Sequence, residues 1–158
     1  MNLRLIPTTI TFAALALMPS CSEAQKKAKD AGPALTAGIV NKLGFKKASP
    51  VKAGDAEWTI GNIHIYSSYH YGKGIHGFSG PTPLFIAVDQ RQKIIGIAAA
   101  PNQESPDIFQ WTKPLMKAWN GKSLKEAQSY TPDAVSGATF SSKAIIKTVH
   151  ATAKAIAK

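Results

Sequence analysis

The sequence contains very little cysteine and arginine, and each shortage excludes a class of protein. Cys21 is the only cysteine among 158 residues, so no disulfide can form within the chain and its core must stabilise the fold. Arg4 and Arg91 are the only arginines. Nucleic-acid-binding proteins favour arginine for forked contacts to phosphate and guanine, and no binding motif is present. We therefore expect no nucleic-acid partner.

Lysine supplies nearly all of the positive charge. Lys and Arg together number 19 against 9 Asp and Glu, which gives a formal net charge of +10. These lysines are scattered along the chain, for example at Lys26, Lys46, Lys73, Lys93, Lys113, Lys125, Lys143 and Lys158. We interpret them as a basic solvated surface that favours an anionic membrane face or an acidic redox partner.

The N-terminus carries an apolar run that is too short to cross a bilayer comfortably. Residues 5–18 are uncharged and mostly apolar, and they follow the single charge of Arg4. A basic start followed by a short apolar stretch is the layout of a secretory signal peptide. We predict that residues 1–20 are this peptide. Its removal takes away only Arg4 among the charged residues, so the net charge falls by one from +10 to +9.

Cys21 directly follows the small residue Ser20 at the end of this run. The arrangement resembles the lipobox of bacterial lipoproteins, in which the cysteine becomes the first residue and receives a diacylglycerol. Met18 and Pro19 differ from the usual lipobox residues, and a plain cleaved signal peptide is the alternative. The resemblance implies lipidation at Cys21 and an exported, membrane-anchored protein that faces the periplasm or the cell exterior.

The rest of the chain divides into a linker region, 21–50, and a domain, 51–158. Ser22 to Pro33 has the composition of a tether. Leu35 to Leu43 has apolar residues at four-residue spacing, which predicts a short helix ended by Gly44.

Strands are predicted in the first half of the domain. Alternation from Trp58 to Ser67 predicts one strand, and the glycine-rich segment from Tyr69 to Gly80 predicts a loop. The apolar runs Leu84–Val88 and Lys93–Ala98 predict a β-hairpin joined by residues 89–92.

Helices are predicted in the second half. Ser105 and Pro106 form a helix start, and Pro114 is expected to kink or divide the helix. Its expected apolar face consists of Ile108, Trp111, Leu115 and Trp119. A further turn is expected at 123–128, and a final helix from Ser141 to Ala157 with an apolar stripe at Ile145, Val149, Thr152 and Ile156. These elements predict an α+β fold, a small, twisted, mainly antiparallel sheet packed with helices.

The segment before the last helix, residues 133–139, has the sequence D-A-V-S-G-A-T. Gly137 permits a sharp turn, and Ser136 and Thr139 place hydroxyl groups where a helix begins. The N–H groups at a helix N-terminus favour a phosphate, and Lys143 adds positive charge nearby. From these residues alone, an ordinary Ser or Thr helix cap without a ligand is the favoured interpretation, because such caps are common.

This segment resembles the D-x-x-[ST]-G-A-T flavinylation motif of the FMN-binding domain family. That family includes the flavin subunits of the sodium-pumping NADH:quinone reductase and of Rnf-type complexes, and many small exported lipoproteins. The resemblance implies that the oxygen of Thr139 is joined to the phosphate of FMN. It also implies a partner enzyme, an FAD:protein FMN transferase, which uses FAD and magnesium and releases AMP. The flavin would then lie near the N-terminus of the last helix.

Two other segments are similar to the same family, so the resemblance covers roughly residues 64–158. They are the glycine-rich turn 77–81 and the segment Glu104-Ser105-Pro106, in which Ser105 replaces a usual threonine. From the resemblance and from the local chemistry together, the residues expected around the cofactor are Asp133, Ser136, Gly137, Ala138, Thr139, Ser141, Lys143, Phe78 and Glu104.

Several of these roles have an ordinary alternative. Phe78, Trp111 and Phe140 are candidates to stack on the flavin ring, although Trp111 fits a core position and Phe140 fits a hydrophobic anchor of the last helix. Lys143 or Lys73 is expected to place positive charge near the ring. Glu104 either hydrogen-bonds the flavin or stabilises the helix that follows it. Asp133 is either a turn residue or part of what the transferase recognises.

The sequence thus predicts an exported flavoprotein that transfers electrons between membrane-associated and extracytoplasmic redox partners, such as a membrane redox complex or an exported acceptor. One alternative is a flavin-dependent reductase of a small acceptor, with His76 as proton donor. Another is a cofactor-free basic lipoprotein that acts as a binding module. The spacing of His64, His70 and His76 matches no strong zinc pattern, so we expect no metal site.

Overall fold

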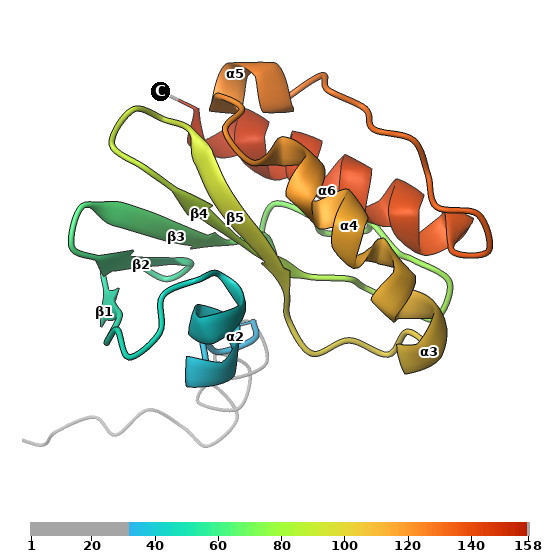
Figure 1. Ribbon diagram of the computed structural model, residues 1–158, viewed down its shortest axis with the longest axis horizontal. Helices are drawn as coiled ribbons and strands as arrows, with labels where there is room; N and C mark the ends of the chain where they lie inside the picture. Colours follow the sequence, from blue (N-terminus) through green and yellow to red (C-terminus); the bar gives the residue numbers. More distant parts are fainter. Residues whose placement is uncertain (1–31, 158) are drawn as a thin grey trace, which may run out of the picture. The chain divides into compact units, whose positions relative to one another are not determined.

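The computed structural model describes residues 32–157, which form an antiparallel sheet with helices packed on both faces (Figure 1). The predictions for the signal peptide 1–20, for Cys21 and for most of the tether lie outside the described residues. Within them, the predicted α+β class is confirmed.

The sheet has five strands in the order β1-β2-β3-β4-β5, so each strand pairs with its neighbour in sequence. The strands are β1 (Val51–Lys52), β2 (Glu57–Ile60), β3 (Ile63–Ser67), β4 (Leu84–Val88) and β5 (Ile94–Ala99). All five residues of β4 are buried because helices cover both sides of the sheet there. This explains why β4 is a continuous apolar run rather than an alternating one. The predicted hairpin of β4 and β5 is confirmed.

The single strand predicted from Trp58 to Ser67 is wrong, because the chain reverses in its middle. Gly61 has a φ of +56°, and the turn that it begins joins β2 to β3. Ile60 pairs with Ile63 across this two-residue hairpin. A glycine at the first central position suits such a turn because its φ is positive. Two short alternating strands in succession gave the pattern of one longer strand.

One face of the sheet is covered by helix α2 (Ala37–Lys42). Thr36 caps this helix by accepting a hydrogen bond from the N–H of Ile39 at 3.4 Å, so the helix begins two residues later than predicted. The cluster beneath it contains Ile39, Leu43, Ile65, Phe85, Ala87, Ala98 and Ala100. The predicted short helix is therefore confirmed and packs on the sheet.

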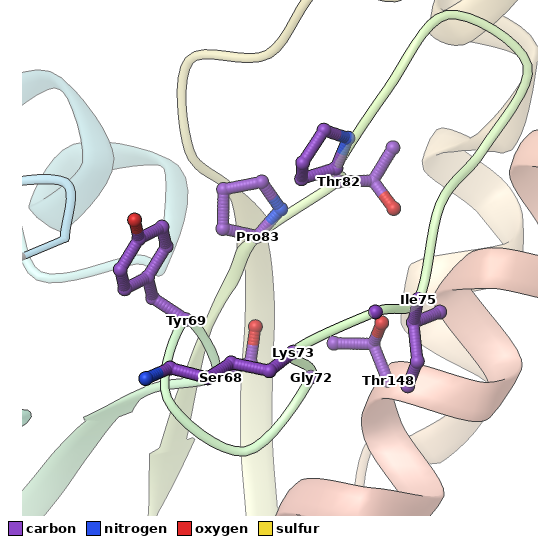
Figure 2. Close-up of a pocket in the computed structure, with 10 residues that line it drawn as sticks. Ser68, Tyr69, Gly72, Lys73, Ile75, Thr82, Pro83 and Thr148 are labelled. Atoms are coloured by element: carbon purple, nitrogen blue, oxygen red, sulfur yellow. The ribbon is translucent and has the colours of Figure 1, made fainter. Parts of the chain in front are cut away.

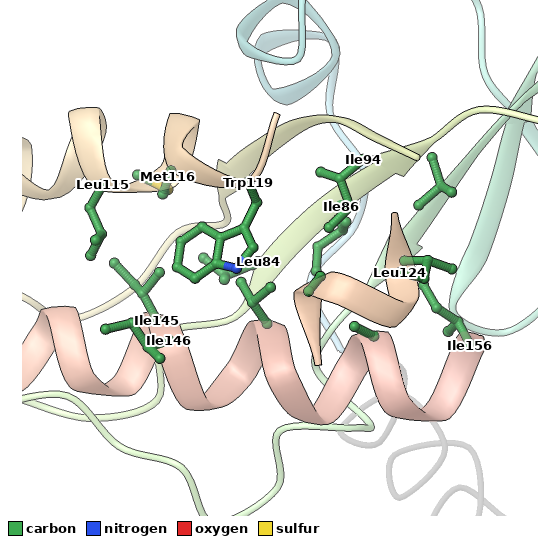
Figure 3. Close-up of a cluster of buried hydrophobic side chains, with 14 residues drawn as sticks. Leu84, Ile86, Ile94, Leu115, Met116, Trp119, Leu124, Ile145, Ile146 and Ile156 are labelled. Atoms are coloured by element: carbon green, nitrogen blue, oxygen red, sulfur yellow. The ribbon is translucent and has the colours of Figure 1, made fainter. Parts of the chain in front are cut away.

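The opposite face is covered by helix α6 (Thr139–Ile156) and the shorter helices before it (Figure 3). Trp119 is fully buried, and it lies between α6 and the segment that carries Leu115 (Figure 3). The predicted stripe of α6 is confirmed, since Ile145, Val149, Thr152 and Ile156 are all buried. Burial of this stripe fixes α6 across the sheet and so fixes the position of its N-terminus.

The predicted helix after Ser105 is divided into short pieces. They are α3 (Pro106–Phe109), the 3₁₀ turn η1 (Gln110–Thr112), α4 (Lys113–Met116) and the 3₁₀ turn η2 (Lys117–Trp119). Pro114 lies in the first turn of α4, where its missing N–H costs no hydrogen bond. Helix α5 (Leu124–Ala127) follows and has a capping box, in agreement with the predicted turn at 123–128.

The four-residue apolar face predicted for this segment is only half correct. Leu115 and Trp119 are buried, whereas Ile108 and Trp111 are 41% and 50% exposed. The 3₁₀ turn η1 has three residues per turn rather than 3.6, so it shifts the face presented by the residues before it. The alternative that placed Trp111 in the core is therefore wrong.

Candidate functional site

The segment with the D-A-V-S-G-A-T sequence forms the loop that enters α6, and Thr139 is the first residue of that helix. Ala138, the residue at the N-cap position, is buried and offers no side-chain hydrogen bond to the first turn. The Thr139 side chain is exposed beside N–H groups that no capping side chain satisfies. The ordinary Ser or Thr cap is therefore absent from this helix, and the first turn can receive an anion.

Gly137 is required by both the backbone and a neighbour. Its φ is +79°, and a Cβ built on it would lie only 2.7 Å from the ring of Trp111. The loop is also held by two hydrogen bonds of Val135, whose C=O accepts the N–H of Ala138 at 3.0 Å and whose N–H donates to Ser142 Oγ at 3.1 Å. These contacts fix the backbone that presents Thr139.

Glu104 joins the glycine-rich turn to the first turn of α6. Its side chain is 7% exposed, and its Oε1 accepts the N–H of Ser79 at 2.7 Å. Its Oε2 accepts a hydrogen bond from the buried Ser141 hydroxyl. A Cβ on Gly77 would lie 2.7 Å from Oε1, so the glycine lets the turn approach the carboxylate closely. We call the Ser79–Glu104–Ser141 connection the carboxylate clamp.

The carboxylate clamp contains two of the residues predicted to lie around the cofactor, Glu104 and Ser141. Neither hydrogen bond of the Glu104 carboxylate goes to α3, the helix that follows it. Ser141 is 3% exposed and donates to Glu104. In this structure both residues therefore support the site from within, and direct contact of either with the cofactor stays a prediction.

Three large aromatic side chains are exposed around Thr139. Phe78 is 77% exposed, Phe140 is 66% exposed and Trp111 is half exposed. The rings of Phe78 and Phe140 have centroids 6.2 Å apart, and Trp111 lies against Gly137. Exposed apolar groups that cluster in this way mark a ligand or partner surface. We call these three residues the aromatic patch. The alternative of Phe140 as a hydrophobic anchor of the last helix does not agree with this exposure.

The other predicted site residues lie at separate places around this helix end. Lys143 is exposed one turn after Thr139, so both side chains share one side of α6. Asp133 and Ser136 are exposed in the loop. Lys73 instead lines a cavity of about 200 Å³ under the glycine-rich segment (Figure 2).

That cavity contains a feature that the sequence analysis did not find. The Thr82 hydroxyl is buried beside it and has no hydrogen-bond partner within the described residues. Ser68 and Thr148 line the same cavity from β3's end and from α6 (Figure 2). The carboxylate clamp was missed as well, because 37 positions separate Glu104 from Ser141 and no local pattern links them.

No group of three metal-ligating side chains occurs among residues 32–157. His64 instead contacts Glu57, with 2.6 Å between its Nδ1 and the Oε1 of that carboxylate. In the same part of the chain, none of the helices combines the length and apolar character needed to span a membrane.

The fold and the site together define a class of protein. An α+β domain presents an uncapped helix N-terminus, an exposed hydroxyl and a patch of aromatic rings, which suits a cofactor with both a phosphate and a flat ring system.

The comparison with known families agrees with this class. The model of the FMN-binding domain family matches residues 77–154, and this segment is assigned to that family. The matched segment contains the glycine-rich turn, Glu104 and the whole loop before α6. No curated protein matches the chain.

The residues present fit FMN. The uncapped first turn of α6 would hold the phosphate beside Thr139, and the aromatic patch would contact the ring. Gly137 and Gly77 allow the backbone and the clamp to approach closely, where any side chain would clash. FMN bound here would supply redox chemistry, while this chain would position it and set its surroundings.

Proposed function

We propose that this chain is an exported flavoprotein that carries FMN covalently on Thr139 and transfers electrons between membrane-associated and extracytoplasmic redox partners. The observation that carries the proposal is the complete D-x-x-S-G-A-T sequence at the uncapped start of α6, inside the segment that matches the FMN-binding domain family.

The proposed attachment has a balanced chemistry. The Thr139 hydroxyl oxygen forms a bond to the FMN phosphorus of FAD, the diphosphate bond of FAD breaks, AMP leaves and the hydroxyl proton is released. An FAD:protein FMN transferase would catalyse this step. The exposure of Thr139 supports the proposal, because a second protein must reach this hydroxyl.

The first test is the intact mass of the chain after co-expression with such a transferase and denaturation. We expect a gain equal to FMN less one water, carried by the peptide that contains Thr139, and no gain in Thr139→Ala. Thr131→Ala is the matched control because Thr131 is also an exposed threonine of the same connection but lies outside the motif. Covalent FMN on the Thr139→Ala protein would contradict the proposed attachment.

Export and anchoring form a separate part of the proposal and rest on residues 1–21. We expect the wild-type protein to sediment with membranes and Cys21→Ser to be released from them, because the lipid has lost its attachment atom. Ser22→Ala, one residue further on, is the control. Retention of Cys21→Ser in the membrane fraction would show that Cys21 is not the anchor.

A further inference from the structure

A groove lies along the open edge of the sheet. β5 is the last strand of the sheet, and it lies between α2 and the segment that contains α4 (Figure 1). The groove has a volume of about 840 Å³. Its apolar walls contain Ile39, Leu43, Ile95, Ile97, Phe109 and Met116. We call it the edge groove.

The strand at the base of the groove has unpaired backbone groups. In β4, the N–H of Leu84 donates to the Ser68 hydroxyl at 2.7 Å, and the C=O of Leu84 accepts the N–H of Ser68 at 2.8 Å. Neither group therefore bonds Ala99, the residue that pairs with Leu84 on β5. In an antiparallel pair, the N–H and C=O groups of Ala99 must then point away from β4. The same holds for Ile97, two residues before it. Beyond Ile94, no backbone hydrogen bond to this outer edge is present within residues 32–157.

The rim of the groove carries charge of one sign. Lys42 on α2 and Lys113 and Lys117 on the opposite wall are exposed at its border. Glu104 is the only carboxylate among the described residues that line it, and both of its oxygens already accept hydrogen bonds. The groove therefore combines free strand donors and acceptors, an apolar base and an uncompensated positive rim.

We propose that the edge groove binds an extended acidic segment of a partner protein, which pairs with Ile97 and Ala99 as an added strand. Main-chain hydrogen bonds to an open strand supply affinity in this mode of recognition, and the side chains beside the strand supply specificity. Acidic side chains of the segment would meet the three lysines. Because Glu104 lies at one end of the groove and also holds the glycine-rich turn, the bound segment would end next to the proposed flavin site.

The charge argues against two other occupants. A second copy of the mature chain would bring a net charge of +9, one less than the +10 of the full sequence, against a basic rim. The chain's own residues 22–31 carry three basic and two acidic side chains, at Lys26, Lys27, Lys29, Glu23 and Asp30. Their net charge of +1 has the same sign as the groove, whereas an acidic partner has the opposite sign.

The test is a titration of the full-length mature protein with a synthetic peptide of alternating Glu and Val. N-methyl groups on every second residue leave this peptide one hydrogen-bonding edge and stop it from stacking on itself. We expect the amide NMR signals of Ile97 and Ala99 to shift on binding. The same peptide methylated at every residue has no donors and is expected not to bind.

Charge and backbone variants provide matched controls. The triple reversal of Lys42, Lys113 and Lys117 to Glu is expected to weaken binding about tenfold, because each rim charge contributes a fraction of the affinity. Reversal of Lys125, Lys147 and Lys154, three exposed lysines outside the groove, changes the net charge equally and is expected to leave the affinity within about twofold. Ala99→Pro removes the outward N–H without removing a bond to β4, and it should also weaken binding.

The proposal does not depend on the flavin, so the titration is repeated on Thr139→Ala with the same expected affinity. Equal binding by both triple variants, or by the fully methylated peptide, would overturn it. Protection of the Ile97 and Ala99 amides from hydrogen exchange in the absence of peptide would also overturn it. If deletion of residues 22–31 removes this protection, the chain itself occupies the groove. If the protection rises with protein concentration, a second copy occupies it.

Discussion

At the residue scale, the loop before α6 depends on the absence of a side chain at Gly137. A side chain there would meet the Trp111 ring and would also have to adopt a φ of +79°. Most L-residues reach that region only at a cost of about 1 kcal/mol or more. The Gly in the family motif is thus explained by two separate constraints in this chain, of which one comes from a residue 26 positions away.

We predict that Gly137→Ala lowers the free energy of unfolding by about 1–3 kcal/mol, because the backbone strain and the contact with Trp111 add. Urea unfolding followed by tryptophan fluorescence measures the change. In Gly137→Ala/Trp111→Leu the contact is relieved but the strain remains, so part of the loss should be recovered. An unchanged stability in Gly137→Ala would mean that the loop adopts another backbone conformation.

At the element scale, the carboxylate clamp connects the glycine-rich turn to α6. The position of the turn depends on both hydrogen bonds of this one buried carboxylate, since a buried donor without a partner costs about 1–3 kcal/mol. Glu104 provides both acceptors from a segment that precedes α3, and the sheet is not involved in either bond. The relative position of Phe78 and Thr139 follows from this connection.

We predict that Glu104→Ala destabilises the protein by about 1–3 kcal/mol and speeds hydrogen exchange at the Ser79 amide, because Ser79 and Ser141 both lose their acceptor. Glu104→Gln is the matched variant. Its Oε1 can accept from Ser79 while its amide donates to the Ser141 oxygen, so most of the protection should return. If Gln and Ala variants exchange equally fast, the negative charge rather than the hydrogen bonding holds the turn.

At the scale of the whole molecule, the free energy of unfolding at alkaline pH depends on Tyr66 in β3. Burial, together with the nearby Glu57 carboxylate and its hydrogen bond, raises the pKa of Tyr66 to about 12. A tyrosine in the unfolded chain has a pKa of about 10. Between these values the unfolded state loses the phenol proton while the folded state keeps it, so the free energy of unfolding falls as the pH rises.

We predict that Tyr66→Phe reduces this alkaline loss, since phenylalanine has no proton to release. Thermal unfolding of both proteins across pH 10 to 12 provides the comparison. Tyr130→Phe is the control because the ring keeps its edge contact with Trp119, and it should lose stability with pH as the wild type does. Parallel curves for Tyr66→Phe and wild type would place the effect in other groups, such as the lysines.

Local sequence patterns were sufficient to predict several elements of this protein. The apolar stripe of α6, the hairpin of β4 and β5, the helix start at Ser105 and the glycine-rich turn were all predicted, because each depends on neighbours within a few positions. The motif at residues 133–139 was likewise visible, and the family match over residues 77–154 confirms the predicted family.

Only the tertiary structure decided the features that depend on distant residues. The reversal at Gly61 divides one apparent strand into two, and the 3₁₀ turn at 110–112 leaves Trp111 exposed instead of buried. The carboxylate clamp and the edge groove join residues from separate elements, and packing of helices on both sides of the sheet determines both. The sequence by itself determined the motif and elements such as α6 and the β4–β5 hairpin, because local sterics and periodicity set them. The surroundings of Thr139 required the folded chain, because contacts between residues far apart in sequence create them.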